Sequence, residues 1–341
     1  MSYLAQSNAL TDRVTAESVG IAYPAIPEGR LGAFHVAVPR FEEQSAIVRF
    51  LDHADRRIRR FILAKQKLFK LLEEQKQAII HHAVTRGLDP NVPLKPSNIP
   101  WVGDIPQHCE VLRSKYIFRE VDDRSETGGE THLSMSQKLA LVPSSRIEER
   151  RLVSESYAGG KICEPGDLVL NRLKAHLGVF ALAPERGLIS PDYTVFRQVR
   201  ELKPQYFELV YRTPACRIEL RQRAKGIVQG FWRLYTDDFY DIRVPVPPVP
   251  EQEGIVAQLE IDLADLNTAI HRTEREIGLI REYRTRLVAD VVTGKLDVRA
   301  AGASLPDEAD EPEVLNEDAL IESEDDDTEA DLDATPEEAE A

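Results

Sequence analysis

Residues 43–89 read EQSAIVRFLDHADRRIRRFILAKQKLFKLLEEQKQAIIHHAVTRGLD, and a related sequence of the same length returns as residues 251–297. The two copies align without a gap at an offset of 208 residues, and 12 of the 47 aligned positions are identical. Each copy begins with Glu-Gln shortly after a proline and ends on a segment that contains Thr, Gly, Leu and Asp. An internal repeat of this kind indicates two equivalent structural units.

Both copies are predicted to form long helices that pack together. Apolar residues recur three and four positions apart, which is the spacing of one helix face. At about 1.5 Å per residue each copy would extend about 65–70 Å, longer than the usual helix of a globular core, which is the alternative. The predicted packing residues are Ile58, Ile62, Phe69, Leu72 and Ile79 in the first copy, and Leu266, Ile270, Ile277, Ile280 and Leu287 in the second.

The rest of the 341-residue chain divides around these helices, and we expect an α+β fold with one globular domain between two long helices that pack as a coiled coil. Residues 41–89 and 246–297 are the helices, and residues 90–245 alternate short apolar segments with turns, as an α+β domain does. Residues 1–40 are too few to bury a core and are expected to be the remnant of a truncated domain, with strand-like alternation before the first helix.

The charge is unevenly distributed along the chain. The formal net charge is −15, but residues 302–341 contain 18 Asp and Glu and no Lys or Arg, so residues 1–301 carry about +3. The composition predicts that residues 298–341 form an acidic disordered tail. A solubilising extension is the preferred interpretation, and a competitor for a DNA site is the alternative.

Cysteine usage and hydropathy point to a cytoplasmic chain. Cys109, Cys163 and Cys216 have no CxxC spacing, and neither a signal peptide nor an apolar run of membrane-spanning length is evident. We therefore expect reduced thiols. The eight histidines are scattered, so no metal site is expected.

Nucleic-acid binding is predicted from basic, amide and hydroxyl side chains beside the turns of residues 90–245. Such side chains contact base edges and neutralise phosphates, although in loops they are often only solvated. The candidate DNA-binding residues are Ser134, Ser136, Gln137, Lys138, Asn171, Arg172, Lys174, His176, Arg223, Lys225, Gln229 and Arg233.

Catalysis by this chain is not expected. It has no phosphate-binding Walker loop, dinucleotide fingerprint, nucleophile elbow or methyltransferase motif. Pro191-Asp192 followed by Glu201-Leu202-Lys203 resembles the metal-binding core of many nucleases. Both halves are short and common, however, and PDYTVF is more typical of a turn that enters a strand.

The order of several motifs resembles the specificity subunit of type I restriction-modification enzymes over residues 20–297. The motifs are TRGLDP, IPWVGDIPQHCEV, LSMSQK, the segment ERRLVSESYAGGKICEPGDLVLNRLKAHLGVFALA, ISPDYTVF and GFWRLYTDDF before VPVPPVPEQ. The resemblance implies a non-catalytic subunit with two target recognition domains, each reading half of a split sequence in double-stranded DNA. It also implies that the two helical regions pack as an antiparallel coiled coil.

The resemblance further implies the partners. These would be DNA methyltransferase subunits that use S-adenosylmethionine, and restriction and translocase subunits that use ATP and Mg²⁺; the chain itself is expected to hold no cofactor. Two features depart from the family pattern: Cys109 stands where a Trp is common, and a single complete recognition domain is present. Pairing with a second copy, pairing with a fragment that carries the other domain, an inactive remnant, and a coiled-coil interaction module that reads no DNA all remain open.

Overall fold

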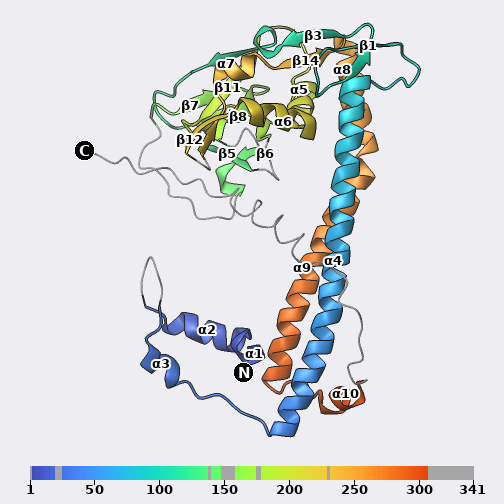
Figure 1. The fold of residues 1–341 in the computed structure, drawn as a ribbon. Helices are drawn as coiled ribbons and strands as arrows, with labels where there is room; N and C mark the ends of the chain where they lie inside the picture. The colour runs from blue at the N-terminus through green and yellow to red at the C-terminus, as the bar shows by residue number, and fades with distance from the viewer. Residues whose placement is uncertain are drawn as a thin grey trace. The chain divides into compact units, whose positions relative to one another are not determined.

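The computed structural model describes residues 2–19, 25–136, 140–146, 158–173, 178–228 and 231–305. It divides into two compact units (Figure 1). We call described residues 2–74 and 265–305 the helical unit and described residues 75–264 the globular unit. The mixture of long helices with antiparallel sheets confirms the predicted α+β class.

Two long antiparallel helices form the centre of the helical unit. The helix α4 (Phe41–Arg86) contains no Gly or Pro and continues into the globular unit, and α9 spans Ala264–Val292. Arg284 Nε donates to Asp55 Oδ1 at 2.5 Å, and Lys65 Nζ lies 2.6 Å from Glu276 Oε2. Residue numbers rise along α4 as they fall along α9, so the two helices run antiparallel.

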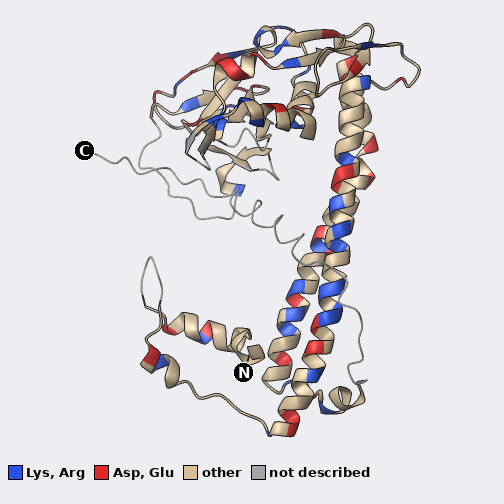
Figure 2. Ribbon diagram, in the orientation of Figure 1, with Lys and Arg blue, Asp and Glu red and all other residues tan. Residues whose placement is uncertain are grey.

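The helix pair packs through an apolar cluster. Leu51 is 1% exposed and packs with Val288, Val291 and Val298. All ten predicted packing residues are buried or partly buried, with Ile58, Ile270 and Ile277 among the buried ones. Charges of both signs alternate along the remaining faces (Figure 2). The shorter helices of this unit are α1 (Ser2–Ala5), α2 (Asn8–Glu17), α3 (Glu28–Gly32) and α10 (Arg299–Ser304).

Three sequence-based expectations about these segments are wrong in detail. The tail that was predicted to be disordered from residue 298 begins with the helix α10, and Val298 is 3% exposed. Described residues 25–40 contain the helix α3 and no strand, apart from an isolated bridge between Val19 and Ala25. Pro27 immediately precedes the helix and Glu28 lies in its first turn, both of which favour a helix start. The second long helix is not continuous, because α8 (Val249–Asp262) ends at Leu263 before α9 begins.

A four-stranded antiparallel sheet organises the globular unit. Its order is β4 (Phe118–Val121), β11 (Tyr193–Gln198), β8 (Leu168–Asn171) and β9 (Phe180–Leu182). Five two-stranded sheets complete it: β1 (Leu94–Pro96) with β2 (Asp104–Pro106), β3 (Glu110–Arg113) with β14 (Arg243–Val246), β5 (Leu133–Ser136) with β6 (Ala140–Pro143), β7 (Lys161–Cys163) with β10 (Gly187–Ile189), and β12 (Lys225–Val228) with β13 (Phe231–Arg233). The helices are α5 (Pro204–Arg212), α6 (Pro214–Arg223), α7 (Thr236–Tyr240) and α8, with 3-10 turns η1 (Ser114–Tyr116) and η2 (Ser144–Arg146).

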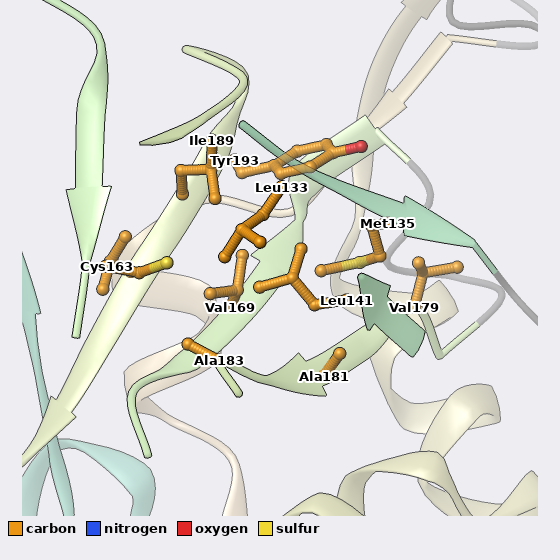
Figure 3. Packing of buried hydrophobic residues seen from close by; sticks show 11 residues of the cluster. Leu133, Met135, Leu141, Cys163, Val169, Val179, Ala181, Ala183, Ile189 and Tyr193 are labelled. Atoms are coloured by element: carbon orange, nitrogen blue, oxygen red, sulfur yellow. The ribbon is translucent and has the colours of Figure 1, made fainter. Parts of the chain in front are cut away.

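Both faces of this sheet are buried. Val195 belongs to an aliphatic cluster with Val169 and Leu133 (Figure 3). Its neighbour Phe196 points to the opposite face, as alternation along a strand requires, and its ring lies 4.3 Å from that of Phe239 between centroids. The three cysteines are free and buried, and no described helix has the length and apolarity of a membrane span.

Hydrogen bonds connect the end of α4 and the start of α8 to the rest of the globular unit. The Tyr206 hydroxyl donates to Val84 O at 2.9 Å, and Gln252 Oε1 accepts from Lys203 N at 2.9 Å. Gly87 ends α4 with φ +73°, and a Cβ built there would lie 2.8 Å from Glu251 Oε1. The left-handed backbone conformation therefore favours glycine at this position, and a larger residue would also displace the Glu251 carboxylate.

Candidate nucleic-acid interface

Three segments that are distant in sequence meet at one end of the four-stranded sheet. Because β8 and β11 are antiparallel, Asn171 at the end of β8 lies opposite Tyr193 at the start of β11. The chain after β8 continues to Arg172, whose carbonyl oxygen accepts from Leu234 N at 3.1 Å. The sheet register therefore brings β13 and the Pro191-Asp192 turn to the same place.

Arg172 and Arg233 both contact Asp192 in this turn. The Arg172 Nε donates to the Asp192 carbonyl oxygen at 3.0 Å, and Arg233 Nη2 donates to the Asp192 carboxylate at 3.4 Å. The Arg233 and Asp192 side chains are 40% and 38% exposed, so the ion pair remains accessible to solvent and to a ligand. Two guanidinium groups thus share a turn that supplies one carboxylate.

Lys161 adds a third cation close to this turn. Its side chain is nearly buried, and Nζ donates to Tyr193 O at 2.8 Å. Burial, followed by the charge of Arg172, lowers the pKa of Lys161, while Asp122 opposes that shift. The cluster of Lys161, Arg172 and Arg233 favours an anionic ligand, because each further negative charge relieves repulsion among these cations.

A hairpin of β12 and β13 lies beside the cluster. Lys225 pairs with Arg233 across the hairpin, and Gly226 pairs with Trp232. Lys225 Nζ lies 2.8 Å from Asp238 Oδ2 and its side chain is 67% exposed. Arg223, at the end of α6, donates from Nε to Glu219 Oε1 at 2.7 Å.

The predicted DNA-binding residues fall into three groups in the structure. Arg172, Arg223, Lys225 and Arg233 are partly or well exposed. Ser134 is 1% exposed with its Oγ 2.7 Å from Ser144 Oγ, and Asn171 is 4% exposed with its Oδ1 accepting from Leu173 N at 3.1 Å. Gln137, Lys138, Lys174, His176 and Gln229, and the side chain of Ser136, lie outside the described residues. The side chains of Ser134 and Asn171 are therefore buried inside the protein, and the DNA role of the other residues stays a prediction.

Sequence reasoning missed Lys161 and Trp232. Lys161 precedes an apolar segment, and nothing in its local sequence indicates that it lies beside Tyr193 at the end of the four-stranded sheet. Trp232 stands next to Arg233 in GFWRLYTDDF, and an aromatic residue beside a cation was the available signal.

The nuclease-like pattern does not form a carboxylate cluster among the described residues. Asp192 is paired with Arg233. Elsewhere in the described part of the chain, three potential metal-ligating side chains do lie close together: His108, Cys109 and Glu251. In that cluster Glu251 and the His108 Nε2 lie 2.5 Å apart, and burial, followed by the Glu251 charge, raises the pKa of Cys109 to about 12. The trio therefore contains a hydrogen bond between His108 and Glu251 and a protonated thiol.

Comparisons with known proteins were made for the whole chain, and no family model matches it. A putative type I restriction enzyme MjaX specificity subunit from Methanocaldococcus jannaschii is 22% identical over 285 residues, which cover 81% of this chain and 62% of that protein. The chain thus spans about three fifths of the length of this curated relative.

Solved structures also match. One, from work on complex assembly and conformational transition of the type I R-M system, is 18% identical, covers 86% of this chain and 70% of its own, and has a TM-score of 0.58. An HsdS subunit from Thermoanaerobacter tengcongensis, also 18% identical, covers 86% of this chain and 69% of its own with a TM-score of 0.40. The curated relative confirms the resemblance to type I specificity subunits, and the first structure supports the fold.

Proposed function

We propose that this chain, which is similar to type I restriction-modification specificity subunits, reads one DNA half-site with residues 90–245 and uses its long helices to scaffold the other subunits. The observation that carries the DNA-reading part is the cluster of Lys161, Arg172 and Arg233 at the end of the sheet. Clustered guanidinium groups beside turns suit bidentate contacts to guanine edges and to phosphates.

The charge distribution supports this proposal over a purely structural role for the cluster. Arg172 donates its Nε hydrogen to the Asp192 carbonyl oxygen. Arg233 forms a solvent-exposed ion pair with the Asp192 carboxylate, and such a pair contributes little to stability. An incoming phosphate or base edge can therefore compete for these donors at low cost. Arg197 has similar exposure, 37%, but behaves differently, because it makes two hydrogen bonds to Asp167, a carboxylate that is 4% exposed.

A comparison of the two repeats supports a second recognition domain that packs against the first repeat. At the start of the second repeat, Gln252 is 0% exposed and Val256 is 9% exposed, because α5 packs against α8. Their equivalents in the first repeat are Gln44, which is partly exposed, and Val48, which is 44% exposed. A domain like residues 90–245, on a second copy or on a complementing fragment, would cover this face.

The partners follow from the same proposal. Methyltransferase subunits would bring S-adenosylmethionine, and restriction subunits would bring ATP and Mg²⁺, to a cytoplasmic complex on double-stranded DNA. This chain would supply sequence recognition and spacing, with no catalytic residue of its own. The alternative is a coiled-coil module that assembles proteins without reading DNA. The helix pair is compatible with either function.

A binding titration separates these alternatives. We expect the full chain to bind duplex DNA, with affinity that falls steeply as salt rises. Arg172→Ala and Arg233→Ala should each weaken binding by about 1–3 kcal/mol. Arg57→Ala, which removes the same charge from an exposed position on α4, is the matched control and should bind as the wild type does. Equal binding by all four proteins would assign DNA contact elsewhere, and no binding by any would favour the coiled-coil module.

A further inference from the structure

Trp232 is a large aromatic side chain exposed on the β12–β13 hairpin. It is 38% exposed, and the residue opposite it in the hairpin register is Gly226. Because Gly226 has no side chain, the indole lacks the cross-strand side-chain neighbour that usually stabilises a strand residue. The hairpin is instead held by Leu234, which is fully buried two residues later.

Two cationic residues and a second exposed ring lie near Trp232 along the hairpin and the chain that follows it. Arg233 is its direct neighbour, and the Leu234 N–H bond to Arg172 O ties this strand to the basic cluster. Tyr235 is 46% exposed, and Lys225 Nζ lies 5.9 Å from the centroid of its ring. Isolated exposed aromatics are common on protein surfaces, but here two of them lie within four residues of the chain, next to a hairpin that also carries Lys225 and Arg233.

We propose that Trp232 contacts a base of the target duplex and helps to determine specificity, an inference that rests on the proposed DNA-reading function. A two-stranded β-ribbon fits the major groove, where the apolar group on base edges is the thymine C5 methyl. The indole carries no charge, so it cannot neutralise a phosphate. Its contribution should therefore be independent of salt, and contact with a thymine methyl group makes it depend on sequence, whereas the contribution of Arg233 or Lys225 depends on salt.

The indole also provides its own reporter, because Trp101 and Trp232 are the chain's two tryptophans. Among the described residues, the buried Trp101 Nε1 has no hydrogen-bond partner, so Trp101→Phe removes an unsatisfied donor and should be tolerated. In this variant all tryptophan fluorescence comes from Trp232. We expect that fluorescence to change on saturation with the tightest-binding duplex selected from a randomised pool by the full chain.

Two further measurements identify the contact. Trp232→Ala should weaken binding to the selected duplex by about 5- to 100-fold, with the salt slope unchanged, and Trp232→Phe should restore part of the loss. Replacing thymines by uracil one at a time removes single methyl groups. At one position this should weaken wild-type binding by about fourfold, and it should leave Trp232→Ala binding unaffected.

The outcomes separate the two proposals. Saturable, salt-dependent binding with unchanged Trp232 fluorescence, or an equal loss on every duplex tested, overturns the base contact and leaves the DNA-reading function in place. Failure of the full chain to enrich any duplex overturns the function, and the base contact with it.

Discussion

Gln44 and Gln252, which lie 208 residues apart, make the same hydrogen bond: each side-chain Nε2 donates to the carbonyl oxygen of a proline five residues earlier, Pro39 or Pro247, at 2.8 Å. The repeat is thus conserved down to the contact that fixes the turn before each helix. The copies differ in what surrounds the glutamine, since only the Oε1 of Gln252 also accepts the backbone N–H of Lys203 among the hydrogen bonds described.

The first prediction uses this difference. Gln252→Ala leaves the buried carbonyl of Pro247 and the partly buried N–H of Lys203 without these partners, which should lower the free energy of unfolding by about 2–4 kcal/mol. Gln44→Ala, the matched variant in the other repeat, removes one partly exposed bond and should cost about 1 kcal/mol. Urea unfolding followed by circular dichroism measures both; equal losses would contradict the assigned contacts.

The second prediction tests the packing of α4 in the helical unit. Leu51 is 1% exposed within the cluster of Val288, Val291 and Val298, so Leu51→Ala should destabilise this unit by about 2–5 kcal/mol. Leu71 lies on the same helix but is 53% exposed, and Leu71→Ala should stay within about 0.5 kcal/mol of the wild type. If both variants unfold at the same urea concentration, Leu51 does not belong to the packed interface between the helices.

The third prediction concerns pH. Burial acts to raise the pKa of Asp55, but the hydrogen bond and charge of Arg284, with help from Arg59, outweigh it and lower the pKa. A carboxyl with a lowered folded pKa stabilises the fold above its unfolded pKa of about 3.9, and this stabilisation is lost as pH falls through the folded pKa.

Asp55→Asn should therefore cost about 1 kcal/mol near pH 7, and the difference from the wild type should shrink and vanish as the pH falls through the lowered folded pKa of Asp55. The control is Asp12→Asn, which makes the same change at an exposed position. A wild-type advantage that is constant over this range would rule out the ion pair as its source.

The fourth prediction concerns the thiols. Burial, followed by nearby carboxylates, raises the pKa of Cys109 and of Cys163 to about 12, and burial also raises that of Cys216. Since the thiolate is the nucleophile, the native chain should resist iodoacetamide near pH 8 while the urea-unfolded chain takes up three labels. Mass spectrometry counts the labels, and rapid native labelling would show that a cysteine is accessible.

The sequence predicted the helices well because their determinants are local and repeated. Periodicity and the absence of Gly and Pro gave the extent of α4 closely, whereas the interruption at Leu263 has no such marker. Strand-like alternation before Phe41 was misleading, because Pro27 and Glu28 start a helix there.

The candidate site was less predictable, because residue type does not reveal direction. Ser134 and Asn171 have side chains suited to base contacts, yet the sheet turns them inward. Lys161 reaches the site only through the pairing of β7 with β10 and its bond to Tyr193, and both depend on long-range register. A local motif search cannot supply such information.

The central claim is that this chain reads a DNA sequence, and competition binding of the full chain tests it most directly. A duplex enriched from a randomised pool is labelled and displaced either by itself or by a scrambled duplex of equal composition, at one fixed salt concentration. We predict that the enriched duplex competes at least about 1,000-fold better than the scrambled one, the lower end of the usual specificity range. Equal competition by the two duplexes would contradict the account, because the basic cluster would then bind DNA by charge alone.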